Sequence, residues 1–163
     1  MTNQLSDALL NECPEIAFGG LFLYGVVTGD ITKNHGWGEN YEFKSKPNLA
    51  KGILCTALWR GYVSYYKLLD DGTLMLEYFG YPLSENQEPD IANEQLEGDF
   101  WLVMKERFRG ERTYVPFRSG RIVSDKNEWI DEKSLKNIAI KSAPLGRWVL
   151  QAIGRFWRAL GTK

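Results

Sequence analysis

The dipeptide Asp71-Gly72 restricts the fold of this chain more than any other local feature. It separates two runs rich in β-branched and aromatic residues, roughly 53–69 and 73–81. A type I′ turn needs a positive φ at both central residues, which Asp and Gly tolerate, so the pair predicts a two-residue turn between antiparallel strands. The resulting register places Tyr65 opposite Tyr78, Tyr66 opposite Glu77 and Leu68 opposite Met75.

Both faces of this predicted hairpin carry large apolar side chains, instead of one apolar and one polar face. We therefore expect either that both faces are covered or that one of them receives a ligand. An apolar cavity with a few polar groups is the usual form of a small-molecule site. The candidate pocket residues are Trp59, Tyr62, Tyr66, Glu77, Phe79 and Tyr81.

Further strands and helices are predicted on both sides of the hairpin. Gly and Pro residues bound the strands, and Asp131 is a suitable N-cap for a helix with Leu135 and Ile138 facing inward. The predicted strands are 20–27, 41–44, 100–108, 113–117 and 121–123, with turns at Arg109-Gly110 and Ser119-Gly120. The predicted helices are 4–12, a short one between Pro89 and Gly98, 132–141 and 144–161.

The order of these elements predicts an α+β fold. At its centre we expect either a curved antiparallel sheet, formed by a meander of hairpins, or a partly closed barrel. A short N-terminal helix and C-terminal helices are expected to pack on it. A chain of 163 residues is long enough for one domain with its own core. We expect a single domain over residues 1–163, to which the 144–161 helix is appended.

The segment 144–161 has the periodicity of an amphipathic helix. Its apolar residues follow the i, i+3, i+4, i+7 spacing, and basic residues occupy the remaining side. Such a helix can close the core of its own domain, bind a partner protein or lie at a membrane surface. Its candidate contact residues are Arg147, Trp148, Arg155, Phe156, Trp157 and Arg158.

Charge is distributed unevenly along a chain whose net charge is only −1. Residues 134–163 contain six basic residues and no acidic one, which leaves 14 basic against 21 acidic residues in positions 1–133. The segment 84–99 holds six acids and no base. This balance argues against nucleic acid as the partner, and the charge zones favour recognition of a protein.

The predicted second hairpin contains a local excess of cations. A ribbon of basic side chains can bind phosphates or an acidic protein. The same residues are also expected on an edge strand, where charge prevents pairing with another sheet. The candidate residues of this ribbon are Lys105, Arg107, Arg109 and Arg112.

Motifs that carry enzyme chemistry are absent from the sequence. No nucleotide-binding or nucleophile motif occurs, and one histidine with two distant cysteines cannot form a Cys/His zinc site, so we expect no metal and no cofactor. The loop that contains Asp30, His35 and Trp37 offers an acid–histidine pair, although a histidine in such a loop is commonly just exposed to water. Cys55 lies in an apolar run and is expected to be buried.

Two further features bear on location. The N-terminus lacks the basic region of a signal peptide, and the longest apolar stretch, residues 16–27, is too short to cross a bilayer. We therefore expect a cytoplasmic protein.

These observations lead to one main functional hypothesis and two alternatives. The main hypothesis is a non-enzymatic protein-interaction module, such as a small regulatory, adaptor or immunity-type factor, that uses its acidic and basic zones to select a partner protein. The first alternative is a small-molecule binder or small enzyme with the aromatic pocket on the 59–81 hairpin. The second is attachment to a membrane surface through residues 144–161.

Overall fold

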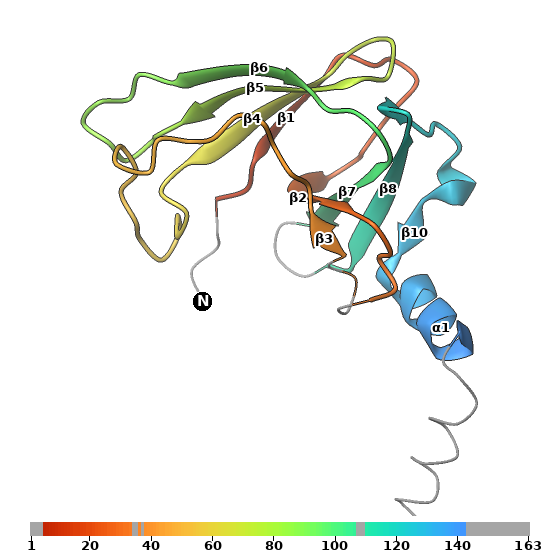
Figure 1. The fold of residues 1–163 in the computed structure, drawn as a ribbon. Helices are drawn as coiled ribbons and strands as arrows, with labels where there is room; N and C mark the ends of the chain where they lie inside the picture. The colour runs from red at the N-terminus through yellow and green to blue at the C-terminus, as the bar shows by residue number, and fades with distance from the viewer. Residues whose placement is uncertain (1–4, 34–35, 37, 107–109, 143–163) are drawn as a thin grey trace, which may run out of the picture.

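The computed structural model of the chain describes residues 5–33, 36, 38–106 and 110–142. The predicted helix 144–161 and its candidate contact residues lie outside these ranges, as do His35, Trp37, Arg107 and Arg109. The elements in chain order are β1 (Ala8–Asn11), β2 (Leu21–Thr28), β3 (Glu39–Asn40), β4 (Val63–Leu68), β5 (Leu74–Gly80), β6 (Asp90–Gln95), β7 (Phe100–Glu106), β8 (Arg112–Arg118), β9 (Arg121–Ile122), the 3₁₀ helix η2 (Lys126–Glu128), β10 (Ile130–Asp131) and α1 (Glu132–Ser142) (Figure 1).

The strands form two sheets that pack against each other. The smaller sheet has the order β1-β4-β5-β6, and the larger has the order β10-β8-β7-β2-β3, with β9 also paired to β8. All ladders are antiparallel except β1 with β4, which is parallel. The prediction of an α+β fold with antiparallel pairing is confirmed in this broad form. The sheets do not close into a barrel, so that alternative is wrong.

The hairpin around Asp71-Gly72 is present, but its turn is one residue longer than predicted. The Leu69 N–H donates to the Thr73 carbonyl, so three residues form the loop, and Gly72 takes a φ of +84°. Near the turn Tyr66 therefore faces Leu76 and Leu68 faces Leu74, which corrects the predicted partners Glu77 and Met75. A bulge at Glu77 restores the predicted register, in which Tyr65 faces Tyr78.

The strand pairing predicted for the second hairpin is confirmed, whereas Arg109 of its predicted turn lies outside the described residues. β7 and β8 pair antiparallel, and β9 follows β8 after a turn at Ser119-Gly120. These turn residues have φ values of +50° and +75°, the conformation that a two-residue type I′ turn requires.

The predicted N-terminal helix over 4–12 is wrong, because this segment forms β1. The apolar spacing that suggested a helix is too short to outweigh pairing with β4, whose backbone groups would otherwise form an unpaired edge. β1 runs alongside β4, with Leu9 opposite Tyr66.

The helix predicted between Pro89 and Gly98 is also wrong, because this segment forms the edge strand β6. Pro89 has no N–H to donate and precedes the strand, a position in which proline is tolerated. β6 pairs with β5, and Asn93 adopts a φ of +47° where the ladder is irregular.

The predicted strand over 41–44 is displaced toward the N-terminus, since β3 contains only Glu39 and Asn40. The backbone that follows β3 forms hydrogen bonds with a side chain instead of with a neighbouring strand. The N–H groups of Lys44 and Ser45 donate to the two carboxylate oxygens of the buried Glu94, at 2.9 and 2.7 Å. Burial alone would raise the pKa of Glu94, but these two hydrogen bonds bring it below its usual value.

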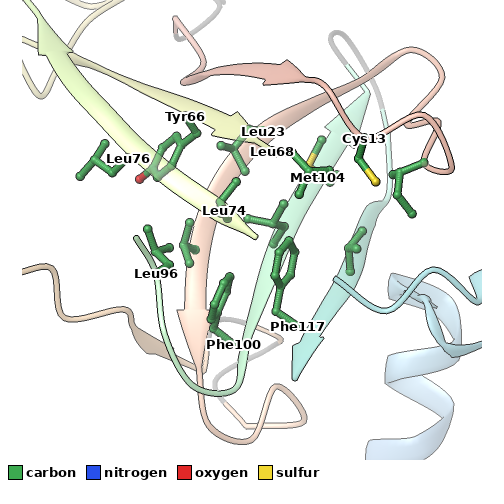
Figure 2. Close-up of a cluster of buried hydrophobic side chains, with 14 of the residues drawn as sticks. Cys13, Leu23, Tyr66, Leu68, Leu74, Leu76, Leu96, Phe100, Met104 and Phe117 are labelled. Carbon is green, nitrogen blue, oxygen red and sulfur yellow. The ribbon is translucent and has the colours of Figure 1, made fainter. Parts of the chain in front are cut away.

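The main core lies between the two sheets. Figure 2 shows Leu68, Leu74 and Leu76 of the smaller sheet opposite Leu23, Phe100, Met104 and Phe117 of the larger one. A second cluster covers the other face of the larger sheet, where Val103 and Tyr114 pack against Leu135 of α1.

Helix α1 begins as predicted. Asp131 caps it by accepting a 2.6 Å hydrogen bond from the Ser134 N–H. Leu135 faces inward and is buried, but Ile138 is 44% exposed, so its predicted inward position is wrong. No helix in the described ranges is long and apolar enough to cross a membrane.

Candidate functional site

A loop between β3 and β4 presents large apolar side chains to solvent. We call residues 48–61 the apolar loop. Isolated exposed leucines are normal on protein surfaces, whereas several neighbouring ones mark interaction sites. The exposed fractions are 69% for Leu49, 46% for Ile53, 69% for Leu54 and 66% for Trp59.

Two glycines close the base of the apolar loop. A Cβ atom on Gly52 would lie 3.1 Å from the Gly61 carbonyl oxygen, and one on Gly61 would lie 3.0 Å from the Gly52 Cα, so the two backbones touch. Gly61 also has a φ of +76°, which favours glycine. The two ends of the segment between these glycines therefore lie next to each other.

The tip of the apolar loop is tied down as well. Cys55 and Leu58 exchange two backbone hydrogen bonds, of 3.3 and 3.0 Å, and the Leu5 N–H donates to the Ala57 carbonyl at 2.7 Å. The Leu58 side chain is fully buried beneath the tip. Cys55 is exposed, so its predicted burial is wrong; the buried cysteine is Cys13. The turn directs Leu58, not Cys55, into the protein.

A buried carboxylate fixes the C-terminal end of the apolar loop. Asp7, which precedes β1, receives the Arg60 guanidinium at 2.5 Å on Oδ1 and 3.3 Å on Oδ2, and Oδ1 also accepts the Ser64 N–H at 2.9 Å. The Arg60 guanidinium lies 5.0 Å from the Tyr62 ring centroid. Burial opposes the charge of Arg60, but the hydrogen bond and charge of Asp7 raise its pKa overall.

A second carboxylate fixes the N-terminal end. Asp90 of β6 accepts from Lys51 Nζ at 2.6 Å, from the Tyr81 hydroxyl at 2.5 Å and from the Asn48 N–H at 3.1 Å. The hydrogen bond from Lys51, followed by that from Tyr81, lowers the pKa of Asp90. Burial and the bond to Asp90 raise the pKa of Tyr81 to about 12. The apolar loop is thus held at both ends by polar groups of the smaller sheet and its flanking segments.

The predicted aromatic pocket residues do not share one environment. Tyr66, Phe79 and Tyr81 are buried packing residues of the main core, and Tyr62 packs edge-on against Phe79 with ring centroids 5.6 Å apart. Trp59 belongs to the apolar loop instead. Glu77 is displaced by the bulge and its carboxylate lies 3.5 Å from Lys67 Nζ.

Two members of the predicted basic ribbon are described, and they lie side by side. Lys105 of β7 faces Arg112 of β8. Lys105 lies between β2 and β8 in the larger sheet, whereas β10 pairs with β8 only at Thr113 and Tyr114, so Arg112 lies at an edge of the sheet, where charge is expected. They line a cavity of about 320 Å³ together with Tyr24, Gly110 and Glu132.

In the predicted loop site only Asp30 is described. Its Oδ1 accepts from the Thr32 hydroxyl at 2.6 Å and from the Thr32 N–H at 2.9 Å, which lowers the pKa of Asp30. The carboxylate therefore stabilises its own turn. Across the described part of the chain, no three His, Cys, Asp or Glu side chains come together in a group that could hold a metal ion.

The apolar loop itself was missed by sequence reasoning, which assigned residues 53–69 to one long strand. Its signal was the pair of glycines, Gly52 and Gly61, on either side of Ile53-Leu54. Interior glycines weaken a strand and indicate close approach of another backbone. Exposure of Leu54 and Trp59 follows from the return of the chain at these glycines.

Comparisons with known proteins add no assignment. The chain matches no protein-family profile, and neither a curated protein nor a solved structure is significantly similar to it.

Proposed function

We propose that this chain is a non-enzymatic protein-interaction module and that the apolar loop is its contact surface. The observation that carries the proposal is the exposure of Leu49, Ile53, Leu54 and Trp59 on one loop whose backbone is fixed at both ends. Burying such side chains in a partner removes apolar surface from water, which is the main driving force of association. Tryptophan is also among the residues most enriched at energetic centres of interfaces.

The way in which the apolar loop is held supports binding. A loop that is ordered before binding loses less conformational entropy when it meets a partner. The Arg60–Asp7 and Lys51–Asp90 pairs and the Gly52–Gly61 contact supply that order. Exposed leucines on an ordered backbone favour binding to a specific partner surface over nonspecific hydrophobic association.

Acidic residues beside the apolar loop indicate the charge of the partner. Lys51 Nζ also contacts the Glu88 carbonyl at 3.3 Å, which places the start of the acidic 84–99 segment against the loop. In Figure 1 the chain segments before β4 and before β6 emerge at the same end of the smaller sheet. Glu85 and Glu88 are exposed there. An apolar centre with an acidic rim fits a partner protein with an apolar groove bordered by Lys and Arg.

Site-specific photocrosslinking tests the proposal. A benzoylphenylalanine at Leu54 is expected to yield a discrete heteromeric adduct in cells that express the chain. The same group at Leu10 of β1, which is also exposed (54%), is expected to yield none. The captured protein is then purified, and its affinity is measured by calorimetry. Trp59→Ala is expected to weaken binding at least tenfold, and raising the salt concentration is expected to weaken it further because of the acidic rim.

Three results would overturn the proposal. Equal crosslinking from Leu54 and Leu10 would indicate nonspecific contact. An adduct of twice the chain mass alone would assign the surface to self-association. Flotation with lipid vesicles that depends on Trp59, without any protein adduct, would assign it to a membrane surface.

A further inference from the structure

A second feature, separate from the apolar loop, is the apolar face of helix α1. The helix packs mainly against β10 and β8, on the side of the larger sheet away from the smaller one (Figure 1). Leu135, near its start, is 4% exposed, whereas Ile138, three residues later on the same face, is 44% exposed. The apolar face of α1 therefore begins on the sheet and leaves it within one turn.

The sequence continues this apolar face beyond the end of α1. Large apolar residues recur after seven and four residues in turn, which are about two turns and about one turn of an α-helix. They are Ile138, Leu145, Val149, Phe156 and Leu160. The last four belong to the predicted helix 144–161, which lies outside the described residues. Because the face is already exposed at Ile138, we expect something other than the chain's own sheet to cover it.

The opposite side of the same helical pattern is basic. Lys136, Arg147 and Arg158 follow one another at intervals of eleven residues, about three helical turns. Residues 134–163 contain six basic residues and no acidic one. Lys136 Nζ lies 3.5 Å from Glu132 Oε1, but its side chain is 71% exposed, so its charge still faces solvent.

We propose that α1 and the segment 144–161 bind the surface of an anionic lipid membrane. A helix with aromatic and aliphatic residues on one side and basic residues on the other lies in the plane of the membrane interface. Trp148 and Trp157 are on the apolar side, and indole rings are enriched at that depth. Residues 1–133 contain 14 basic against 21 acidic residues, so an anionic surface repels the rest of the chain and restricts contact to this end.

Co-sedimentation of the full chain with sucrose-loaded vesicles tests the proposal. We expect the chain to bind vesicles that contain phosphatidylcholine and phosphatidylserine, and to stay in the supernatant with vesicles of phosphatidylcholine alone. Raising the salt concentration is expected to weaken binding, because salt screens the charges. Trp59→Ala, in the apolar loop, is expected to leave vesicle binding unchanged, which separates this surface from the proposed protein contact.

Substitutions on each side of the helical pattern locate the contact. The double variant Arg155→Gln with Arg158→Gln is expected to lower the partition coefficient at least tenfold, because each basic residue near an anionic surface contributes about fivefold. Ile138→Gln is expected to lower it about fivefold, because roughly half of this side chain is left to be buried in lipid. The matched control is Ile91→Gln, which replaces a 66% exposed isoleucine of β6 and is expected to have no effect.

Thermal unfolding of each variant without vesicles shows whether the fold is retained. Equal binding to both kinds of vesicle, binding to neither, or an equal loss in Ile138→Gln and Ile91→Gln would overturn the proposal. A photocrosslinking group at Ile138 that captures a discrete protein, without vesicle binding, would assign this face to a protein partner. A lower melting temperature for Phe156→Ser, together with unchanged vesicle binding, would assign it to the core of the chain itself.

Discussion

Replacing Asp7 tests whether the apolar loop depends on a buried carboxylate. Asp7 is 6% exposed, accepts the N–H of the buried Ser64 and holds the Arg60 guanidinium. Removal of the carboxylate leaves the Ser64 N–H without this acceptor, which costs about 1–3 kcal/mol. Breaking a fully buried ion pair costs about 3–5 kcal/mol, but the Arg60 side chain is 28% exposed and can be hydrated, which reduces this part. We therefore expect Asp7→Ala to lower the free energy of unfolding by about 3 kcal/mol.

A matched substitution separates the two contributions. Asp7→Asn keeps an oxygen that accepts the Ser64 N–H but loses the charge that faces Arg60, so its cost is expected to be about 1–2 kcal/mol. Glu15→Ala removes an exposed carboxylate and is expected to change stability by less than about 0.5 kcal/mol.

Urea unfolding measures these free energies, and hydrogen exchange locates the change. In Asp7→Ala the amides of residues 53–61 are expected to exchange faster than those of β7, because the tip loses its anchor before the core does. The reasoning is refuted if Asp7→Ala costs less than about 1 kcal/mol. It is also refuted if Asp7→Ala and Asp7→Asn are equal, because the bond to Ser64 would then contribute nothing.

Four further substitutions follow from individual contacts. The hydrogen bonds from Arg112 lower the pKa of Glu132 to about 2 from its usual 4.5. This group therefore adds stability above pH 4.5, and that stability is lost as the pH falls toward 2. Glu132→Gln is expected to make the melting temperature depend less on pH in that range, and an unchanged pH dependence would contradict this. The buried Tyr114 hydroxyl has no hydrogen-bond partner among the described residues, so Tyr114→Phe is expected to stabilise by about 1 kcal/mol in urea unfolding, and a loss of that size would disprove this. A Cβ at Gly36, whose φ is +89°, would lie 2.2 Å from that hydroxyl oxygen, so Gly36→Ala is expected to lower the free energy of unfolding by about 3 kcal/mol. Part of this loss is expected to be recovered in the double variant with Tyr114→Phe. Full additivity of the two substitutions would argue against the contact. Gly61→Ala is expected to cost about 1–2 kcal/mol and to increase hydrogen exchange in the apolar loop, and unchanged exchange would show that the contact with Gly52 does not hold it.

Elements with strong local chemistry were predictable from the sequence. Asp71-Gly72 and Ser119-Gly120 place residues that tolerate a positive φ between β-rich runs, and the structure has turns at both. Asp131 precedes a helix-forming segment and caps it. In each case the interactions that decide the structure lie within a few residues of the signal.

Elements that depend on distant partners were not predictable in this way. Residues 8–11 become a strand because β4 offers a free edge, and residues 90–95 do so because β5 offers another. The register shift caused by the one-residue extension of the first hairpin loop is cancelled by the bulge at Glu77, and no local sequence pattern indicates this bulge. The apolar loop was not predictable for the same reason. The burial of Leu58 and the exposure of Leu54 depend on where the chain turns back toward the smaller sheet.

The parallel pairing of β1 with β4 has a consequence for the order of folding. Asp7 and Ser64, which are joined by a hydrogen bond, are 57 residues apart in the chain, whereas the β4–β5 hairpin closes over a three-residue loop. Hairpins form in about 1–10 μs, but contacts between distant residues must first overcome a larger loss of chain entropy. We therefore expect β1 to add to a preformed β4–β5 hairpin late in folding. The apolar loop then reaches its final conformation in one of the last steps, when Asp7 before β1 forms its ion pair with Arg60.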